Sequence, residues 1–309
     1  MDPTGVRAAG VVVQGVRRSF GSTHAVRDMT FTASPGRVTG LIGPNGSGKT
    51  TLLLMLATLL APDAGTIRIG GLDPLQDAAG VRAVTGWMPD VLGSWASLTT
   101  RATLELTGRL YHLSKPRAAA RAEELIALVG LGELADQPTR VLSRGQKQRM
   151  SLARALVHDP AVLLLDEPAS GLDPEARVDL RILVRSLAAE GRTVLVSSHV
   201  LAELEEMADD AVYVQAGETV DPGRLEALRD APRLWRVRAE DPAALDAALA
   251  GRSDVSADHL GRLVPVRDEA AAADLLAGLV RDGIRVVAFA PASGEMERTF
   301  LELSREARA

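Results

Sequence analysis

The sequence contains no cysteine among its 309 residues. This absence excludes disulfides, thiol chemistry and cysteine-ligated zinc, and it fits a reducing compartment. Long hydrophobic runs are also missing. The longest apolar stretch, Leu52–Ala61, is well short of the ~20 residues that a membrane-spanning helix needs. The first residues, MDPTGVRAAG, lack the apolar core of a signal peptide, so we expect a chain that does not cross a membrane by itself.

Lysine is scarce as well, because only three of the 35 basic residues are lysine, namely Lys49, Lys115 and Lys147. A lysine that persists against such a bias for arginine is a candidate for a role that arginine cannot fill. The net charge of −5 gives no overall electrostatic support for binding a nucleic acid. The chain is too long for one small core, and its length predicts two domains.

Apolar runs alternate with amphipathic helical segments between about residues 38 and 198. The runs Val38–Ile42, Ala161–Asp166 and Thr193–Ser198 are typical of strands buried on both faces of a parallel sheet. The segment between the last two runs predicts a helix, and the three together predict a βαβ unit. Residues 101–157 are mainly helical in pattern and interrupt this sheet as an insert.

The stretch GPNGSGKT, residues 43–50, follows the first of these strands and precedes a predicted helix over residues 50–60. It matches G-x-x-x-x-G-K-[ST], in which glycines let backbone N–H groups surround phosphates and the helix N-terminus adds positive potential. Lys49 is expected to contact the β and γ phosphates, and the Thr50 hydroxyl is expected to bind Mg²⁺. The alternative is a glycine-rich turn that matches by chance. The strand before it and the helix after it argue against that alternative.

Two carboxylates follow the strand at Ala161–Asp166. Beside a phosphate loop, Asp166 is expected to hold Mg²⁺, and Glu167 is expected to act as the general base for an attacking water. His199 ends the next strand, at the edge where ligands bind in such folds, and it is a candidate to contact the γ-phosphate. Without the phosphate loop, a strand end where acids meet solvent would be the better explanation of the two carboxylates. The alternative for His199 is a capping or packing histidine.

These motifs resemble the ATP-binding cassette, the motor subunit of ABC transporters, over about residues 11–229. GPNGSGKT resembles its Walker A loop, VLLLDE its Walker B strand, SGLD (Ser170–Asp173) its D-loop and His199 its switch histidine. The fold class that follows is α/β: a P-loop NTPase cassette with a mixed sheet core and a helical insert at about residues 95–157. The nucleotide-binding loop residues implied are Gly43, Pro44, Asn45, Gly46, Ser47, Gly48, Lys49, Thr50 and Thr51.

LSRGQ, residues 142–146, resembles the family signature, which caps the γ-phosphate of ATP held by the opposing subunit. The resemblance implies that Ser143, Gly145 and Gln146 contact that nucleotide, and the S-x-x-Q spacing also predicts a helix cap. Phe20 occupies the place of the residue that stacks on adenine. Asp90 stands where the family has a glutamine, and a carboxylate there can face Mg²⁺ or its water but cannot donate a hydrogen bond.

After Pro232 the pattern predicts a second domain with the order β-α-β-β-α-β and a closing helix, a small C-terminal α+β ferredoxin-like domain. We place the ATP-binding domain at residues 1–230 and the accessory domain at residues 233–309. The FLELS sequence at Phe300–Ser304 resembles the tail of cassettes from drug-resistance and related exporters. That likeness leaves open whether the domain joins two cassettes or regulates them.

The resemblance implies an ATPase subunit of an exporter, with ATP and Mg²⁺ as cofactors and a homodimer, or a pair with a second cassette, closing over two nucleotides. Separate transmembrane permease subunits would dock on the helical insert and on the segment near residues 90–100, with the chain cytoplasmic at the inner face of the membrane. No nucleic-acid partner is expected. Two alternatives stay open: a non-transport cassette ATPase acting on ribosomes or DNA, and a low-turnover interaction module. The cargo cannot be read from the chain, and the direction of transport is inferred only from the resemblance of the tail and the signature.

Overall fold

The computed structural model describes residues 10–91, 93 and 96–306. The chain forms two compact units, Met1–Val220 and Asp221–Ala309. Apart from Gly10, the N-terminal stretch for which we expect no signal peptide lies outside the described residues. Among the helices of the described part, none is long and apolar enough to span a membrane.

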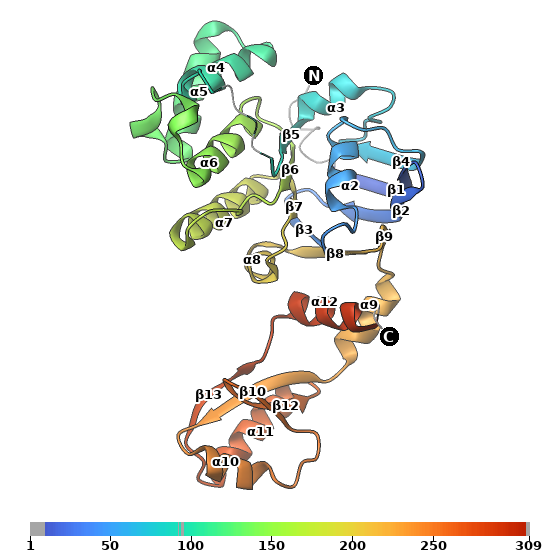
Figure 1. Cartoon of the computed structure of the whole chain (residues 1–309), viewed down its shortest axis with the longest axis vertical. Helices are drawn as coiled ribbons and strands as arrows, with labels where there is room; N and C mark the ends of the chain where they lie inside the picture. Colours follow the sequence, from blue (N-terminus) through green and yellow to red (C-terminus); the bar gives the residue numbers. More distant parts are fainter. Residues whose placement is uncertain (1–9, 92, 94–95, 307–309) are drawn as a thin grey trace. The chain divides into compact units, whose positions relative to one another are not determined.

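The first unit is built on one mixed sheet of nine strands in the order β4-β1-β2-β9-β8-β3-β7-β6-β5 (Figure 1). Its strands are β1 (Val11–Phe20), β2 (Thr23–Ala33), β3 (Val38–Ile42), β4 (Ala64–Ile69), β5 (Thr85–Met88), β6 (Val162–Asp166), β7 (Thr193–Ser197), β8 (Asp210–Gln215) and β9 (Glu218–Thr219). Its helices are α2 (Lys49–Leu56), α3 (Ala78–Val84), α4 (Thr100–Leu110), α5 (Lys115–Leu128), α6 (Arg144–Ala155), α7 (Pro174–Ala189) and α8 (Leu201–Met207), with 3₁₀ turns η1 (Gly132–Leu134) and η2 (Thr139–Val141).

The three predicted central strands are confirmed and lie side by side. β3, β7 and β6 are parallel and buried along their whole length, which explains their uninterrupted apolar sequences. β6, α7 and β7 form the predicted βαβ unit. The sequence did not reveal the antiparallel part of the sheet, where β1 pairs with both β2 and β4.

Helix α2 carries the main core of the first unit. Its buried side chains Leu52, Leu53, Met55 and Leu56 pack in one cluster with residues of both the antiparallel and the parallel strands. The helix ends earlier than predicted, at Leu56, and Thr58 has a left-handed φ of 61°. The phosphate loop is therefore joined to a helix that is fixed at its apolar face.

The helical insert consists of α4, α5 and α6, which Figure 1 shows gathered in green at one end of the first unit. Side-chain caps begin each helix: Thr99 accepts from the Ala102 amide, Ser114 from Arg117, and Ser143 from Gln146. The insert was predicted from about residue 95. Its first helix begins at Thr100, and residue 95 itself lies outside the described residues.

The second unit contains α9 (Pro222–Asp230), β10 (Arg233–Ala239), α10 (Pro242–Leu249), β11 (Ser256–Asp258), β12 (Gly261–Val266), α11 (Glu269–Arg281), β13 (Val286–Pro291) and α12 (Glu295–Glu306). From β10 to β13 the order is the predicted β-α-β-β-α-β, and the strands form an antiparallel sheet in the order β11-β12-β10-β13. Residues of α10 and α11, such as Leu245 and Leu279, join the sheet residues in one core.

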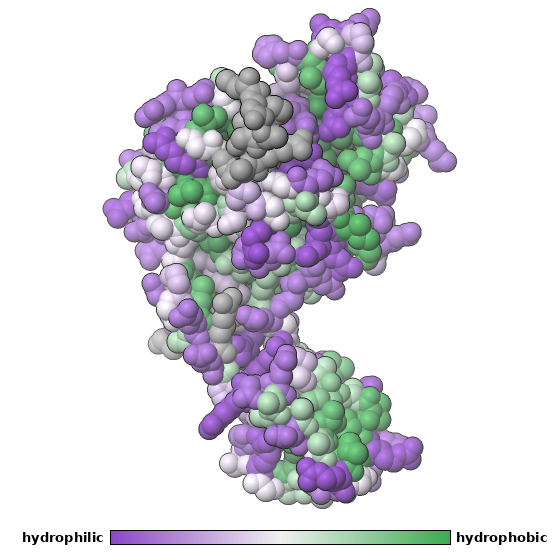
Figure 2. All heavy atoms as spheres, turned by 180° about the vertical axis from the view of Figure 1, so that it is seen from behind, coloured by the Kyte–Doolittle hydropathy of each residue, from purple (hydrophilic) through white to green (hydrophobic). Residues whose placement is uncertain are grey.

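Helix α9 groups with the second unit, whereas our predicted boundary at residue 230 gave it to the first. The reason is the packing of α9 against α12, where Arg298 donates to the backbone carbonyls of Leu228 and Ala231. Figure 2 shows apolar residues gathered on the exposed face of the second unit. The large exposed apolar side chains of this unit are Leu234, Leu260, Val280, Val287 and Leu301.

His158, just after α6, is held in a neutral form. Its ring stacks on Tyr111 with 3.8 Å between centroids and 1° between the planes. Nε2 lies 3.1 Å from the Thr85 carbonyl oxygen, which can only accept, so Nε2 carries the proton. Burial lowers the pKa of His158 from its usual 6.5 to about 4, although the hydrogen bond to Thr85 opposes this shift.

We expect this histidine to weaken the fold in acid. The unfolded chain protonates His158 near pH 6.5 and the folded chain only near pH 4, so stability is complete above pH 6.5 and falls as the pH drops toward 4. Between pH 7.5 and pH 5 the wild type should lose about 2 kcal/mol more unfolding free energy than His158→Gln, which cannot titrate. Urea unfolding at the two pH values measures this difference, and equal losses would contradict the assignment.

Candidate functional site

The phosphate loop leaves the end of β3 and enters α2, as the sequence predicts. Gly48 immediately precedes α2 with a φ of 101°, a conformation that residues with a Cβ rarely adopt. A Cβ on Gly43 would lie 2.3 Å from the Val214 carbonyl oxygen, so the loop starts where the backbone is closely packed. Pro44, Asn45, Gly46 and Thr50 are exposed. The turn therefore presents its backbone to a ligand while its two ends stay fixed.

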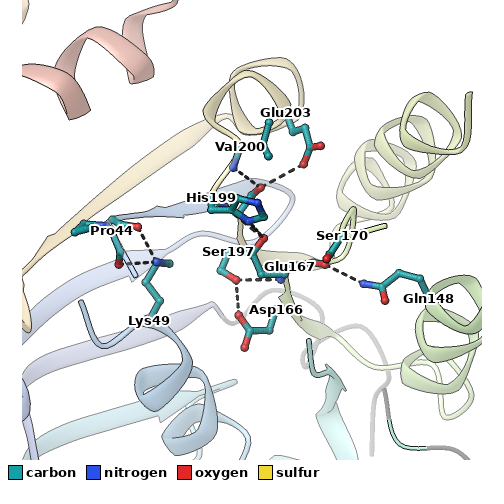
Figure 3. A network of polar contacts seen from close by, with 12 residues as sticks. Pro44, Lys49, Gln148, Asp166, Glu167, Ser170, Ser197, His199, Val200 and Glu203 are labelled. Atoms are coloured by element: carbon teal, nitrogen blue, oxygen red, sulfur yellow. Dashed lines mark hydrogen bonds and ion pairs between the residues drawn. The ribbon is translucent and has the colours of Figure 1, made fainter. Parts of the chain in front are cut away.

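Lys49 is buried at the base of this loop, with a side chain that points back into it (Figure 3). Its Nζ donates to the carbonyl oxygens of Gly43 at 2.6 Å and Pro44 at 3.1 Å. Burial lowers the pKa of the Lys49 ammonium, whereas the charges of Glu167 and Asp166 raise it. An ammonium held by two neutral carbonyls and close to two carboxylates can be shared with phosphate oxygens at little cost in reorganisation.

Two further groups of the loop fit a nucleotide and a metal ion. The Ser47 Oγ is buried and has no hydrogen-bond partner among the described residues, so a phosphate oxygen would satisfy it. The Thr50 hydroxyl lies close enough to the Asp166 carboxylate to lower the pKa of that acid, so a hydroxyl oxygen and a carboxylate oxygen are near each other. Oxygen ligands of these two kinds are those that Mg²⁺ prefers in nucleotide sites.

Asp166 ends β6 and is only 2% exposed. The Ser197 hydroxyl donates to its Oδ1 at 2.5 Å. Burial raises the pKa of Asp166, the Ser197 hydrogen bond and the nearby Thr50 hydroxyl lower it, and the charges of Glu167 and Asp90 raise it again. A cation bound beside this carboxylate would stabilise its ionised form and so lower the pKa of Asp166.

Glu167 has a left-handed backbone, with a φ of 51°. Such a conformation costs about 1–2 kcal/mol in a residue with a Cβ. Both of its backbone polar groups are held: the amide donates to the Ser197 carbonyl and hydroxyl at 3.2 and 3.1 Å, and the carbonyl accepts from Gln148 Nε2 at 2.9 Å and from the Ser170 amide at 3.0 Å. The surrounding structure thus imposes the direction in which the side chain leaves the strand.

The carboxylate of Glu167 turns toward His199. Its Oε2 accepts from the His199 Nδ1 at 2.7 Å and from the His199 amide at 3.3 Å. Glu167 is largely shielded, with 16% of its side chain exposed, whereas 59% of the His199 side chain is exposed. In Figure 3, Asp166, Ser197 and Glu167 lie together between Lys49 and Gln148. The arrangement can orient a water molecule through Glu167 while His199 reaches a ligand from the solvent side.

The signature-like stretch begins α6 with a complete capping box. Ser143 Oγ accepts from the Gln146 amide at 3.2 Å, and Gln146 Oε1 accepts from the Ser143 amide at 2.8 Å. The S-x-x-Q prediction is therefore confirmed. The cap uses both side-chain oxygens only as acceptors, so the Ser143 hydroxyl hydrogen, the Gln146 Nε2 and the Gly145 amide can still face an anion.

Two of the remaining predicted site residues lie at strand ends. Phe20 ends β1 with 49% of the residue exposed, and the guanidinium carbon of Arg18 lies 4.9 Å from its ring centroid. Asp90 is exposed just beyond β5 and is close enough to Asp166 for its charge to raise that residue's pKa. Thr51 follows Thr50 in the first turn of α2 and is half-buried.

Sequence reasoning missed the residues that hold the acids in place. Ser197 pairs with Asp166 in the register of β6 and β7 and bonds both acids. Gln148 is 2% exposed and donates to Glu167. The end of β7 next to an acidic strand end was a usable signal for Ser197. No local pattern indicated Gln148.

Known proteins resemble this chain in sequence and in fold. The family profile described as ABC transporter matches residues 26–170. The chain is 39% identical over 219 residues to the daunorubicin resistance ATP-binding protein DrrA3 of Streptomyces coeruleorubidus, which covers 71% of this chain and 69% of that protein. It is 37% identical to the Nod factor export ATP-binding protein I of Paraburkholderia xenovorans, with 82% and 85% covered.

Among solved structures, the chain resembles a dimeric ATP-binding cassette in a post-hydrolysis state bound to ADP and Pi. The two share 25% sequence identity with a TM-score of 0.64, over 68% of this chain and 97% of that one. The predicted α/β cassette fold is confirmed. The chain belongs to the ABC transporter family, as an ATP-binding, ATP-hydrolysing subunit that resembles the corresponding proteins of drug-resistance and export systems.

Proposed function

We propose that two copies of this chain close over two Mg²⁺-ATP and that opening after hydrolysis drives separate membrane subunits of an exporter. The observation that carries the proposal is the convergence of the phosphate loop, Asp166, Glu167 and His199 at the ends of β3, β6 and β7. The names of the relatives, which refer to drug resistance and Nod factor export, support the direction of transport. The dimeric cassette with ADP and Pi supports the pairing.

In this proposal Lys49 and the loop amides bind the β and γ phosphates, and Thr50 and Asp166 hold Mg²⁺. When bound, the metal ion neutralises phosphate charge. Glu167 Oε1 accepts the proton of the attacking water, while Oε2 stays bonded to His199. Ser143, Gly145 and Gln146 at the start of α6 face the nucleotide of the other copy, where a helix N-terminus contributes about 0.3–1 kcal/mol. Phe20 supplies a face for the adenine.

The metal ion would depend on the nucleotide for part of its coordination. Among the described residues, no group of three or more acidic, histidine or cysteine side chains is arranged to hold a metal. Thr50 and Asp166 would supply one oxygen ligand each, and Asp90 would contact the ion or its water. Since Mg²⁺ favours six oxygens, phosphate oxygens and water would complete the shell.

The permease would contact α4, α5 and the segment around residues 90–100, of which residues 92, 94 and 95 lie outside the described part. In α4, Leu106 and Leu110 are exposed, at 40% and 63%. Exposed leucines one helical turn apart are suited to a protein partner. This docking would place the chain in the cytoplasm, at the inner face of the membrane.

The first test is Glu167→Gln. The variant keeps the size and one acceptor oxygen for His199 but loses the base, so ATP hydrolysis should fall about 10²- to 10⁴-fold while ATP still binds. With hydrolysis blocked, the closed dimer should accumulate in Mg²⁺-ATP. Phosphate release and size-exclusion chromatography with light scattering measure the two effects.

The matched control is Glu175→Gln, which changes an exposed glutamate in the first turn of α7 and should leave both measurements as in the wild type. A Glu167→Gln protein that remains monomeric in saturating ATP would rule out the closed pair. A variant that hydrolyses ATP at the wild-type rate would remove Glu167 from the role of base.

The second test concerns Asp90. We expect Asp90→Gln to keep ATPase activity within about tenfold, because no catalytic base is lost. Removing a negative charge near the phosphates should also tighten ATP binding in EDTA by roughly fivefold, with a smaller effect in Mg²⁺. Competition with a fluorescent nucleotide measures both conditions, and Asp179→Asn on α7 serves as a control. Complete loss of turnover, or equal changes with and without metal, would contradict this role of Asp90.

A further inference from the structure

Arg144 is the third residue of the LSRGQ stretch and the first residue of α6, and its side chain extends away from its own helix. Its Nη2 donates to the Ser170 hydroxyl oxygen at 2.8 Å, across 26 residues of sequence. The aliphatic part of the side chain lies over Gly171, where a Cβ would meet the Arg144 Cδ at 2.6 Å. Gly171 also has a φ of 76°, so this position needs glycine for two reasons.

Two more contacts join the same parts of the chain. A Cβ on Gly145 would lie 3.3 Å from the Leu172 side chain, so the first turn of α6 approaches the Glu167–Leu172 turn closely. One turn further along the helix, Gln148 Nε2 donates to the Glu167 carbonyl at 2.9 Å (Figure 3). The first two turns of α6 therefore hold both ends of the Glu167–Leu172 turn.

The helix itself does not need Arg144. Its N-terminus is already closed by the box between Ser143 and Gln146. A cation in a first turn opposes the helix dipole and costs about 0.3–1 kcal/mol. The contact with Ser170 offsets that cost, and it lies three residues from Glu167, whose carbonyl accepts from the Ser170 amide. The contact that Arg144 makes with Ser170, outside α6, thus best explains an arginine at this position.

We propose that Arg144 is a positioning residue that makes the start of α6 and the Glu167–Leu172 turn move as one body. An anion bound at the start of α6 would then change the orientation of Glu167 in the same chain. The consequence of this coupling rests on the proposed function. In the closed pair, a nucleotide bound by one copy would contact the start of α6 in the other copy and thereby change the orientation of Glu167 in that other copy. The contact itself is a property of the single chain.

The experiment compares Arg144→Met, Ser170→Ala and their double variant with the wild type. Methionine keeps an aliphatic stem over Gly171 and removes the guanidinium. Each single change should lower kcat about threefold to tenfold without changing the KM for ATP, and the double variant should be no slower than the singles. Arg144→Lys keeps a donor and should return kcat to within about twofold of the wild type.

Arg140→Met is the matched control, because it removes an exposed guanidinium four residues earlier. It should leave kcat and KM unchanged. The second readout is amide hydrogen exchange at residues 169–172 without nucleotide. Exchange there should be faster in Arg144→Met and Ser170→Ala than in the wild type and the control, and no faster in the double variant.

Losses of kcat that multiply in the double variant would show that the two residues act independently, and unchanged exchange at residues 169–172 would show that Arg144 does not hold the turn. Either result overturns the proposal. A wild type without Mg²⁺-dependent ATPase activity would instead refute the proposed function. In that case the exchange measurement, which uses no nucleotide, still decides whether Arg144 positions the turn.

Discussion

The in-register pairing of three parallel strands underlies every feature of the site. Ser197 at the end of β7 is paired with Asp166 on one side and with Leu41 on the other. The ends of β6, β7 and β3 are therefore level, and the residues that follow emerge at one edge of the sheet. A shift of one residue in either pairing would reverse the faces of a whole strand and separate Lys49 from the two acids. All three strands are buried along their whole length, so a shifted strand would have to repack its side chains on both faces of the sheet.

Local patterns in the sequence were enough to predict much of this arrangement. Continuous apolar runs identify strands buried on both faces, and the phosphate-loop motif requires a strand before it and a helix after it. Since the carboxyl ends of parallel strands share an edge, Asp166, Glu167 and His199 could be assigned to one site. The capping box at Ser143 was equally predictable, because it depends on only four consecutive residues.

The rest depends on contacts between distant parts of the chain. The strands β1, β2 and β4 alternate less regularly, and β1 carries register shifts on both sides, so periodicity does not reveal them. The bonds of Ser197 to the acids, of Gln148 to Glu167 and of Arg144 to Ser170 join residues 19 to 31 positions apart. Helix α9 follows the first unit in sequence, but it packs against α12 and therefore belongs to the second unit. These contacts depend on how distant segments pack together, which the pattern of a single sequence does not indicate.

The left-handed backbone of Glu167 explains why so many of these distant contacts converge on one turn. A residue with a Cβ keeps that conformation only when its surroundings stabilise it by more than the about 1–2 kcal/mol that it costs. Ser197 holds its amide from the side of the sheet, and Gln148 holds its carbonyl from the helical insert. Loosening either contact would let the backbone relax and turn the carboxylate away from His199. The position of the Glu167 carboxylate therefore depends on the helical insert as well as on the sheet. A partner that moves the insert could in this way change the site.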